Sequence, residues 1–364
     1  MVREEKFTEG QAFDYGIDSH KLIYHIERVY KWWKGEDIYP IYIEAAPAGG
    51  CNQRCIFCGL DYTGHRPSFI DFRCWERFTQ EAKEKGVKSI LLSGEGEPLL
   101  NKDIDKFVES AYQNGLDVAI ATNGVLFTSP LCEKCLPYLT WLRISLDAGS
   151  PDVYSLVHRV DKKEFNTVVH NVATAVKYKR ANNYQVTIGI QFLLLKENYE
   201  DVEKATVLAK EIGVDYFSVK PYSKHPLSIN NAGTEIDYSK WIGLEEKLVK
   251  YNSSLFKVIF RKNAMMRRLR EKPYQRCLGL PFWAYINSYG EVYPCSTFLG
   301  LKEYCMGNIH QESFSQIWEG EKRKRIMKRI AEMDARKCRE LCRLDEINAY
   351  LWRLKNPPPH VNFI

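Results

Sequence analysis

Three cysteines of this chain are close enough in sequence to bind one metal centre. They are Cys51, Cys55 and Cys58, and the pair Gly49 and Gly50 stands directly before them. Three thiolates without a nearby fourth suit a four-iron, four-sulfur cluster that keeps one iron open, whereas structural zinc requires four protein ligands. The glycine-flanked C-x3-C-x2-C spacing therefore predicts a reactive iron–sulfur cluster rather than three packing residues.

A second set of cysteines stands near the C-terminus. Cys277 and Cys295 flank a segment whose alternation over residues 283–295 predicts a β-hairpin with its turn at 287–290. Cys338 and Cys342 follow, and we expect them one turn apart on the same face of a helix. Four thiols can thus converge on a second centre, and either an iron–sulfur cluster or a zinc ion would fit them.

The remaining cysteines carry weaker signals. Cys132 and Cys135 form a C-x2-C pair with no second pair nearby, so we interpret both as packing residues, and Cys74 as a core residue. Cys305 is a spare or substitute ligand of the C-terminal set.

The composition is that of an ordinary globular protein. Hydrophobic residues make up 45% of the chain and charged residues 27%. With 52 basic and 46 acidic residues, the net charge of +6 is too small to predict a nucleic-acid or membrane partner. No signal peptide and no apolar stretch of about 18 residues is visible, so we expect a cytoplasmic protein with reduced thiols rather than disulfides.

The elements that must position the cysteines alternate between about residues 41 and 220. Short β-branched runs and amphipathic helical stretches follow one another there, which predicts βα units around a parallel sheet. We expect six strands, at 41–44, 89–92, 118–122, 141–145, 186–194 and 216–220. Ligands of such sheets bind at the carboxyl ends of the strands, and the first cysteine group directly follows the first strand.

The predicted fold is α/β: a partial (β/α)6 TIM-like barrel with a small C-terminal domain of a β-hairpin plus helix. Tyr24, Tyr30, Trp32 and Trp33, which precede the barrel, are expected to pack in the core. We divide the chain into an N-terminal helical extension, the barrel, a linker with a helix, the cysteine-bearing domain and a tail, at residues 1–40, 41–225, 226–259, 260–345 and 346–364.

The segments that follow the predicted strands resemble those of the radical S-adenosylmethionine (SAM) superfamily. Phe57 precedes the third cysteine as in that family's loop, and Ser93-Gly-Glu-Gly-Glu-Pro98 is similar to its glycine/glutamate motif. The segments beginning at Thr122 and Ser145 resemble the family's ribose- and carboxylate-contacting segments. The residues that this resemblance assigns to SAM binding are Phe57, Gly94, Glu95, Gly96, Glu97, Pro98, Asn123, Ser145 and Arg159.

The resemblance implies radical chemistry. A reduced 4Fe-4S cluster on Cys51, Cys55 and Cys58 would cleave SAM to a 5′-deoxyadenosyl radical, which takes a hydrogen atom from the substrate. The C-terminal segment is similar to the twitch or SPASM type of auxiliary-cluster domain. This similarity implies a second, auxiliary 4Fe-4S cluster on Cys277, Cys295, Cys338 and Cys342.

By analogy with twitch-type alcohol dehydrogenases, the resemblance favours oxidation or epimerisation of a small polar, hydroxyl-bearing substrate such as a sugar or aminocyclitol. The auxiliary cluster would accept an electron, and flavodoxin or ferredoxin would supply one. Lys220, Tyr222 and His225, near the end of the sixth strand, are candidate contacts to substrate or SAM. No residue can be named as the catalytic acid or base.

Two alternatives remain open. One is a peptide-modifying enzyme that forms thioether or carbon–carbon crosslinks. The other is a non-catalytic iron–sulfur or zinc module that binds RNA through the basic runs at 267–270 and 322–325, although a solvated helix face explains such runs more simply.

Overall fold

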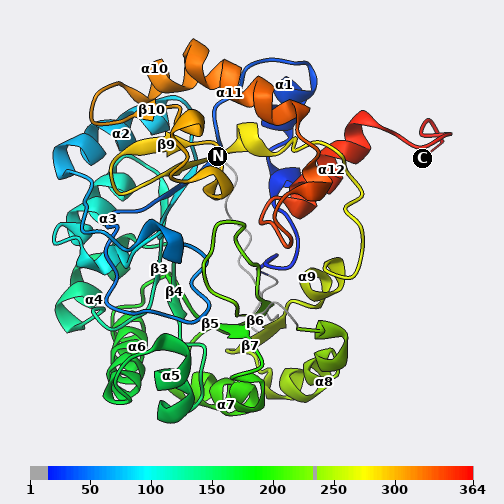
Figure 1. Ribbon diagram of the computed structural model, residues 1–364. Helices are drawn as coiled ribbons and strands as arrows, with labels where there is room; N and C mark the ends of the chain where they lie inside the picture. The colour runs from blue at the N-terminus through cyan, green and yellow to red at the C-terminus, as the bar shows by residue number, and fades with distance from the viewer. Residues whose placement is uncertain (1–14, 233–235, 364) are drawn as a thin grey trace.

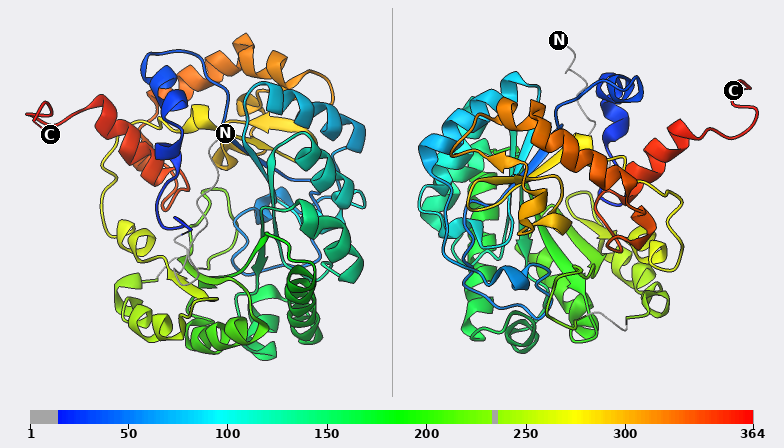
Figure 2. Two further views of the ribbon diagram at one scale, coloured as in Figure 1. Left: turned by 180° about the vertical axis from the view of Figure 1, so that it is seen from behind. Right: turned by 45° about the horizontal axis from the view of Figure 1, so that its top comes forward.

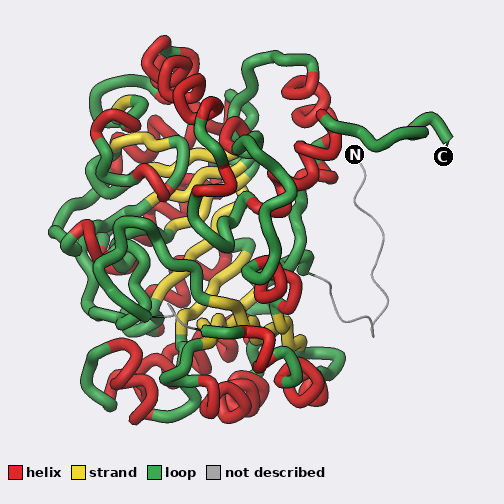
Figure 3. Tube along the Cα trace, turned by 45° about the vertical axis from the view of Figure 1, so that its right-hand side comes forward, coloured by secondary structure: helices red, strands yellow, loops and turns green. Residues whose placement is uncertain are grey.

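The computed structural model describes residues 15–232 and 236–363. Their strands form one continuous ten-stranded sheet, in the order β10-β9-β8-β1-β2-β3-β4-β5-β6-β7, which curves through the molecule (Figures 1 and 3). The strands are β1 (Tyr42–Ala45), β2 (Ser89–Leu92), β3 (Asp117–Thr122), β4 (Trp141–Ser145), β5 (Thr187–Leu194), β6 (Tyr216–Pro221), β7 (Lys257–Phe260), β8 (Trp283–Ile286), β9 (Glu291–Tyr293) and β10 (Gly307–Asn308).

Helices lie along the outer side of the curved sheet, as both views of Figure 2 show. They are α1 (Ile26–Trp33), α2 (Phe72–Glu84), α3 (Ile104–Gln113), α4 (Ser129–Cys135), α5 (Pro151–His158), α6 (Lys163–Ala181), α7 (Val202–Ile212), α8 (Leu244–Leu248), α9 (Lys262–Arg267), α10 (Phe314–Glu319), α11 (Glu321–Glu332) and α12 (Asp345–Lys355). None of the described helices is long and apolar enough to cross a bilayer.

The two faces of the parallel sheet differ in polarity because side chains alternate along a strand. One face presents Ile43, Ile120, Leu142 and other aliphatic residues to the helices, and these side chains are buried in the main core. The opposite face lines the inside of the barrel and carries polar residues. They are Glu44, Arg143, Ser145, Gln191, Ser218 and Lys220.

The α/β fold and the six parallel strands predicted from the sequence are confirmed, and the sheet extends beyond them on both sides. The segment 226–259 contains α8 and the start of β7, which pairs in parallel with β6. On the other side β8 pairs in parallel with β1, and Tyr42 lies opposite Trp283. The C-terminal hairpin is thus continuous with the barrel sheet.

The aromatic residues before the barrel differ from expectation. Trp32 is buried in a small core with Phe282 and Leu351, but Tyr24, Tyr30 and Trp33 are exposed, so their predicted core role is wrong. Only one face of the short helix α1 reaches the body, because a single amphipathic helix lying on the outside of a domain buries one stripe of side chains.

Candidate active site

The first cysteine group lies in the loop after β1 and is held against the C-terminal end of α5. The backbone N–H of Arg54 donates to the carbonyl of His158 (3.2 Å), and the N–H of Ile56 donates to the carbonyl of Val157 (2.9 Å). These bonds join chain segments that follow β1 and β4. They place the cysteine loop at the carboxyl edge of the sheet, where ligands of parallel βα folds bind.

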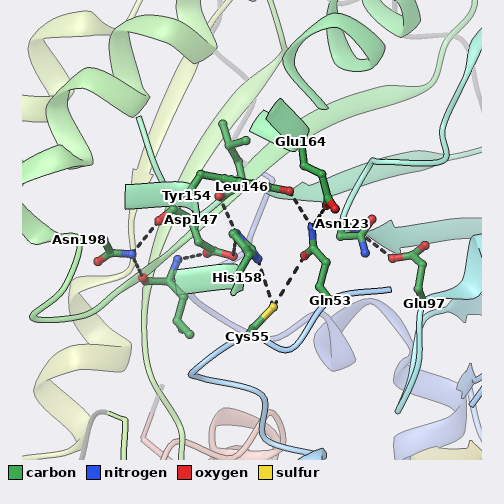
Figure 4. A network of polar contacts seen from close by, with 11 residues as sticks. Gln53, Cys55, Glu97, Asn123, Leu146, Asp147, Tyr154, His158, Glu164 and Asn198 are labelled. Atoms are coloured by element: carbon green, nitrogen blue, oxygen red, sulfur yellow. Dashed lines mark hydrogen bonds and ion pairs between the residues drawn. The ribbon is translucent and has the colours of Figure 1, made fainter. Parts of the chain in front are cut away.

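Cys55 contacts a buried histidine, as Figure 4 shows. The Cys55 Sγ lies 3.1 Å from Nδ1 of His158, whose Nε2 lies 2.9 Å from the carbonyl oxygen of Leu146. A carbonyl only accepts, so Nε2 carries the proton and Nδ1 accepts from the thiol. Burial lowers the pKa of His158 to about 4, which keeps the ring neutral. Phe57 packs edge-on against this ring, with centroids 5.5 Å apart.

A buried amide also fixes the cysteine loop (Figure 4). Gln53 Nε2 donates to the Tyr154 hydroxyl (2.8 Å) and to the Glu164 carboxylate (3.2 Å). The adjoining loop after β4 is held in a similar way, because Asn198 Nδ2 donates to the carbonyl of Asp147 (2.8 Å). Fixed loops of this kind hold ligand-binding side chains in one geometry.

The three thiols repel one another as anions. Burial, with smaller contributions from Glu97 and Cys58, raises the pKa of Cys51 to about 11. Burial and the two neighbouring cysteines raise the pKa of Cys55 well above its usual value. Binding of a cation relieves such repulsion, because a metal-bound thiol is deprotonated outright. The donor set therefore fits a cationic iron–sulfur centre.

The turn after β2 approaches this loop closely. A Cβ at Gly96 would lie 2.3 Å from the carbonyl oxygen of Gly50, and Gly94 has a left-handed φ of +126°. A side chain at Gly96 would push the turn away from the glycine pair before the cysteine loop, and one at Gly94 would collide with Ala46. Pro98 begins a short 3-10 turn (Pro98–Leu100) behind them. The glycine/glutamate segment and the cysteine loop thus form one continuous surface.

The two glutamates of the turn point to different places. The buried carboxylate of Glu97 accepts hydrogen bonds from the Thr122 hydroxyl (2.6 Å) and the Asn123 N–H (2.9 Å). The buried carboxylate of Glu95 accepts from the Ser288 N–H and hydroxyl (both 2.8 Å) and the Tyr285 hydroxyl (2.7 Å). Glu97 therefore joins two loops of the barrel, whereas Glu95 joins the barrel to the C-terminal hairpin.

The other residues assigned to SAM by resemblance lie at the same edge but in different surroundings. Asn123 donates to the side chain of Asn52, next to Cys51 (2.7 Å). Ser145 ends β4 and is half-buried on the inside of the barrel. Arg159 is exposed at the left-handed residue that ends α5. The structure thus places Asn123 directly beside the cysteine loop and Arg159 at the surface next to His158.

The second cysteine group surrounds a cavity of about 540 Å³ that Cys277, Cys295, Cys338 and Cys342 line together. Burial and the neighbouring Cys295 raise the pKa of Cys277 to about 12, and the pKa of Cys342 is raised in the same way. Among the described residues, no three His, Cys, Asp or Glu side chains converge as closely as one metal ion requires. Four thiols that line one cavity can ligate a cubane cluster, in which each iron takes one thiolate.

The predicted helix around Cys338 and Cys342 is wrong. A 3-10 turn (Ala335–Lys337) ends at Cys338, and Leu341 has a left-handed φ of 50°. The ammonium of Lys272 accounts for the difference. It donates to the carbonyls of Ala335 (3.0 Å), Cys338 (2.9 Å) and Arg339 (2.9 Å), so these carbonyls bind a distant cation instead of helical N–H groups.

Several hydrogen bonds and one ring contact connect the two cysteine regions directly. Besides the Glu95 contacts, the Tyr62 hydroxyl donates to the Leu299 carbonyl (3.1 Å). His225 stacks on Tyr62 with centroids 4.8 Å apart, and its Nε2 lies 3.0 Å from the Ser296 carbonyl. We call Glu95, Tyr62, His225 and their partners the seam. His225, which the sequence offered as a ligand contact, therefore lies at this seam.

The sequence did not point to three polar residues that support the sites. His158 and Gln53 hold the first loop, and Asn348 accepts from the N–H groups of Leu278 (2.7 Å) and Gly279 (2.8 Å) beside Cys277. The one available signal was the position of His158 directly before Arg159. Cys132 and Cys135 are fully buried in the core, as predicted for packing residues.

Two family models match the chain in agreement with this geometry. The radical SAM superfamily matches residues 46–209. An iron–sulfur cluster-binding domain, SPASM, matches residues 277–344. The chain therefore carries a radical SAM domain followed by a SPASM iron–sulfur cluster-binding domain. The radical SAM domain binds a 4Fe-4S cluster and SAM, and the SPASM domain binds auxiliary iron–sulfur clusters, so the cofactor predictions are confirmed.

Curated relatives of this radical SAM protein span both domains. The AdoMet-dependent heme synthase of Methanosarcina barkeri is 25% identical over 291 residues, which are 74% of this chain and 79% of that protein. The tungsten-containing aldehyde ferredoxin oxidoreductase cofactor-modifying protein of Pyrococcus furiosus is 23% identical over 291 residues, 75% of this chain and 79% of its own. These names lend no support to a sugar or aminocyclitol substrate.

Solved structures share the fold. SuiB of Streptococcus suis bound to its precursor peptide SuiA has a TM-score of 0.67 at 18% identity, covering 91% of this chain and 75% of that chain. The anSMEcpe protein with bound AdoMet and a peptide has a TM-score of 0.60 at 17% identity, covering 85% and 88%. At these identities the likeness shows the fold alone.

Proposed function

We propose that this radical SAM enzyme abstracts hydrogen from a small polar molecule inside the barrel and oxidises or epimerises it. When bound, SAM and the two clusters supply a 5′-deoxyadenosyl radical and an acceptor for the electron that the substrate radical releases. The observation that carries the proposal is the seam, because Glu95 belongs to the turn beside the first cysteine loop and binds the hairpin that leads to Cys295. Both centres therefore serve one substrate site.

The chain's own residues have separate tasks in this proposal. Cys51, Cys55 and Cys58 hold the cluster that binds SAM, and Gly96 lets the turn after β2 lie against Gly49 and Gly50, directly before these cysteines. Cys277, Cys295, Cys338 and Cys342 hold the auxiliary cluster. The polar inside of the barrel orients the substrate, and the surrounding sheet excludes water from the radical.

Peptide modification is a second candidate. The observation in its favour is the fold that this chain shares with SuiB and anSMEcpe, both of which have been solved with peptides bound. A peptide substrate would enter the barrel as an extended chain, whereas a small molecule would be enclosed.

Product analysis separates the candidates. The anaerobically reconstituted enzyme, with SAM and dithionite, is incubated in D2O with low-mass metabolites in one arm and a peptide library in the other. We expect 5′-deoxyadenosine together with a small molecule that has lost two hydrogens or gained one deuterium. A crosslinked peptide, 2 Da lighter than its precursor, would establish the second candidate instead. No 5′-deoxyadenosine in either arm would contradict the enzymatic proposal.

A further inference from the structure

Two cations share the inner face of the barrel. Arg143 of β4 lies opposite Gly189 of β5, and Lys220 of β6 lies opposite Leu193 of β5. Positions 189 and 193 are an even number of residues apart and so point to the same side of the sheet. Both Arg143 and Lys220 are half-buried, as is Ser145 on the same face. The two cations thus lie deep in the barrel while keeping access to its inside.

Neither cation has an anionic partner in the structure. Within residues 15–232 and 236–363, no hydrogen bond or ion pair is found for the Lys220 ammonium. Arg143 has a buried Nε without a hydrogen-bond partner, and its guanidinium lies over the Trp141 ring at 5.1 Å. A desolvated cation without a partner is costly, so such a pair is unusual unless a ligand completes it.

The other charged groups nearby are already engaged. Arg261 lies 3.5 Å from Asp18, and Arg343 pairs with Glu44. Both arginines add positive potential at Lys220, whose pKa is lowered by burial first and then by Arg143, Arg261 and Arg343. Arg261 and Arg343 therefore each have a carboxylate partner, whereas Lys220 and Arg143 have none among the described residues.

Asp147 is the acidic group that acts on Lys220. Its Oδ1 accepts from the Leu193 N–H, and burial raises its pKa while Lys220 and Arg143 lower it. Across the described part of the chain, no ion pair within 4 Å joins it to Lys220. Asp147 therefore does not replace an external anion.

We propose that Lys220 and Arg143 bind an anionic oxygen group, a carboxylate or a phosphate, of a small-molecule substrate. A guanidinium binds two oxygens of such a group at once, and an ammonium adds a point charge beside it. Ala119 and Ala121 of the neighbouring strand β3 have small side chains on the same face. The identification of the bound molecule as a substrate rests on the proposed function.

The test measures anion binding to the reconstituted holoenzyme saturated with SAM. Inorganic phosphate and succinate are titrated separately by calorimetry, with KCl holding the ionic strength constant. Lys220→Met and Arg143→Met each remove one cation, Lys220→Arg keeps the charge, and Lys177→Met removes an exposed lysine from the outside of α6. We expect at least one anion to bind about ten-fold more weakly to each of the first two variants. Lys220→Arg should retain most of the affinity, and Lys177→Met all of it.

The two anions distinguish the sources of the ligand: preferential phosphate binding indicates a phosphorylated substrate, and preferential succinate binding a carboxylic acid. The proposal would be overturned if wild type, Lys220→Met and Arg143→Met bound the anions with equal affinity. It would also be overturned if neither anion bound saturably. Binding seen only without SAM would also overturn it, because the cations would then hold the SAM carboxylate. Formation of 5′-deoxyadenosine is assayed in parallel. Lys220-dependent anion binding without SAM cleavage would contradict the proposed function and leave the anion site standing.

Discussion

The two cysteine regions are built in different ways. The first takes its three thiols from one loop of eight residues, Cys51 to Cys58, whereas the second takes four thiols from three separate segments between Cys277 and Cys342. The first loop needs its neighbours mainly for orientation. The second region exists only when distant backbone segments are brought together. Local spacing therefore encodes the first site, and tertiary packing encodes the second.

The supporting contacts follow the same division. His158 and Gln53 touch a loop whose spacing is already set by the chain. Lys272 and Asn348 instead hold the backbone on which the second set of thiols stands. The seam then fixes one region against the other. Variants in each class should therefore fail in different ways, which makes the comparison testable.

Loss of the first site should have the largest effect. We expect the Cys51→Ala, Cys55→Ala, Cys58→Ala triple variant to form no 5′-deoxyadenosine, because it lacks all three thiols of the loop that would hold the SAM-binding cluster. Chromatography of the anaerobic assay measures the loss. Cys135→Ala, which removes a buried thiol of the core, is the matched control and should keep cleavage near the wild-type rate. Cleavage of SAM by the triple variant would contradict the assignment of these three cysteines as ligands of the SAM-binding cluster.

Loss of the second site should abolish substrate turnover but spare SAM cleavage. The Cys277→Ala, Cys342→Ala double variant should still form 5′-deoxyadenosine, because its first loop is intact, while product formation stops. Cys305→Ala is the control. Its thiol donates to the Gly307 carbonyl (3.4 Å), and Cys305 is absent from the lining of the 540 Å³ cavity. Loss of turnover in Cys305→Ala would instead make that cysteine a ligand.

Removal of the Lys272 ammonium should destabilise the second region alone. Lys272→Met leaves three carbonyls without their charged donor, which we expect to cost about 3 kcal/mol of unfolding free energy. Chemical denaturation of the holoenzyme measures this change, and auxiliary iron should be lost first. Lys83→Met is the comparison variant, because exposed Lys83 donates to only one carbonyl, that of Gly115. Equal stability of the two variants would contradict the role of Lys272.

The seam should weaken in acid through His225. Burial lowers the pKa of His225 to about 4 in the folded protein, while the unfolded chain titrates near 6.5. The unfolded state thus binds more protons below pH 6.5, and stability present above that pH is lost as the pH falls towards 4. Between pH 7 and pH 5 this one group should cost about 2 kcal/mol. Denaturation at each pH measures the loss of unfolding free energy, which should be smaller by that amount in His225→Gln than in wild type. If the variant and wild type had the same pH profile, His225 would not make this contribution.

The Glu95 contact should show a smaller effect. Tyr285→Phe leaves one buried oxygen of Glu95 without its donor, which we expect to cost about 1–2 kcal/mol of unfolding free energy. Tyr199→Phe removes a hydroxyl bound to exposed Glu200 and should change stability by less than about 0.5 kcal/mol. If both variants were equally stable, Glu95 would not fasten the two regions together.

The features of this protein that could be predicted from its sequence are those that depend on local spacing, and the features that could not are those that depend on tertiary packing. The strands and the Cys51 loop were predictable because alternation and spacing are local properties. The contact of Cys55 with His158, the turn of Glu95 towards Ser288 and the carbonyls bound by Lys272 join residues far apart in the chain. A helix was expected at Cys338 and Cys342 because their spacing is one turn, but the distant Lys272 and Ser223 bind the carbonyls of this segment instead.

Iron and sulfide analysis of the reconstituted protein tests the two-site account most directly. Wild type should contain about eight irons, and the Cys51/Cys55/Cys58 and Cys277/Cys342 variants about four each, with no zinc in any of them. About four irons in wild type, or zinc retained by the C-terminal cysteines, would contradict the claim that two separate cysteine sets hold two four-iron clusters.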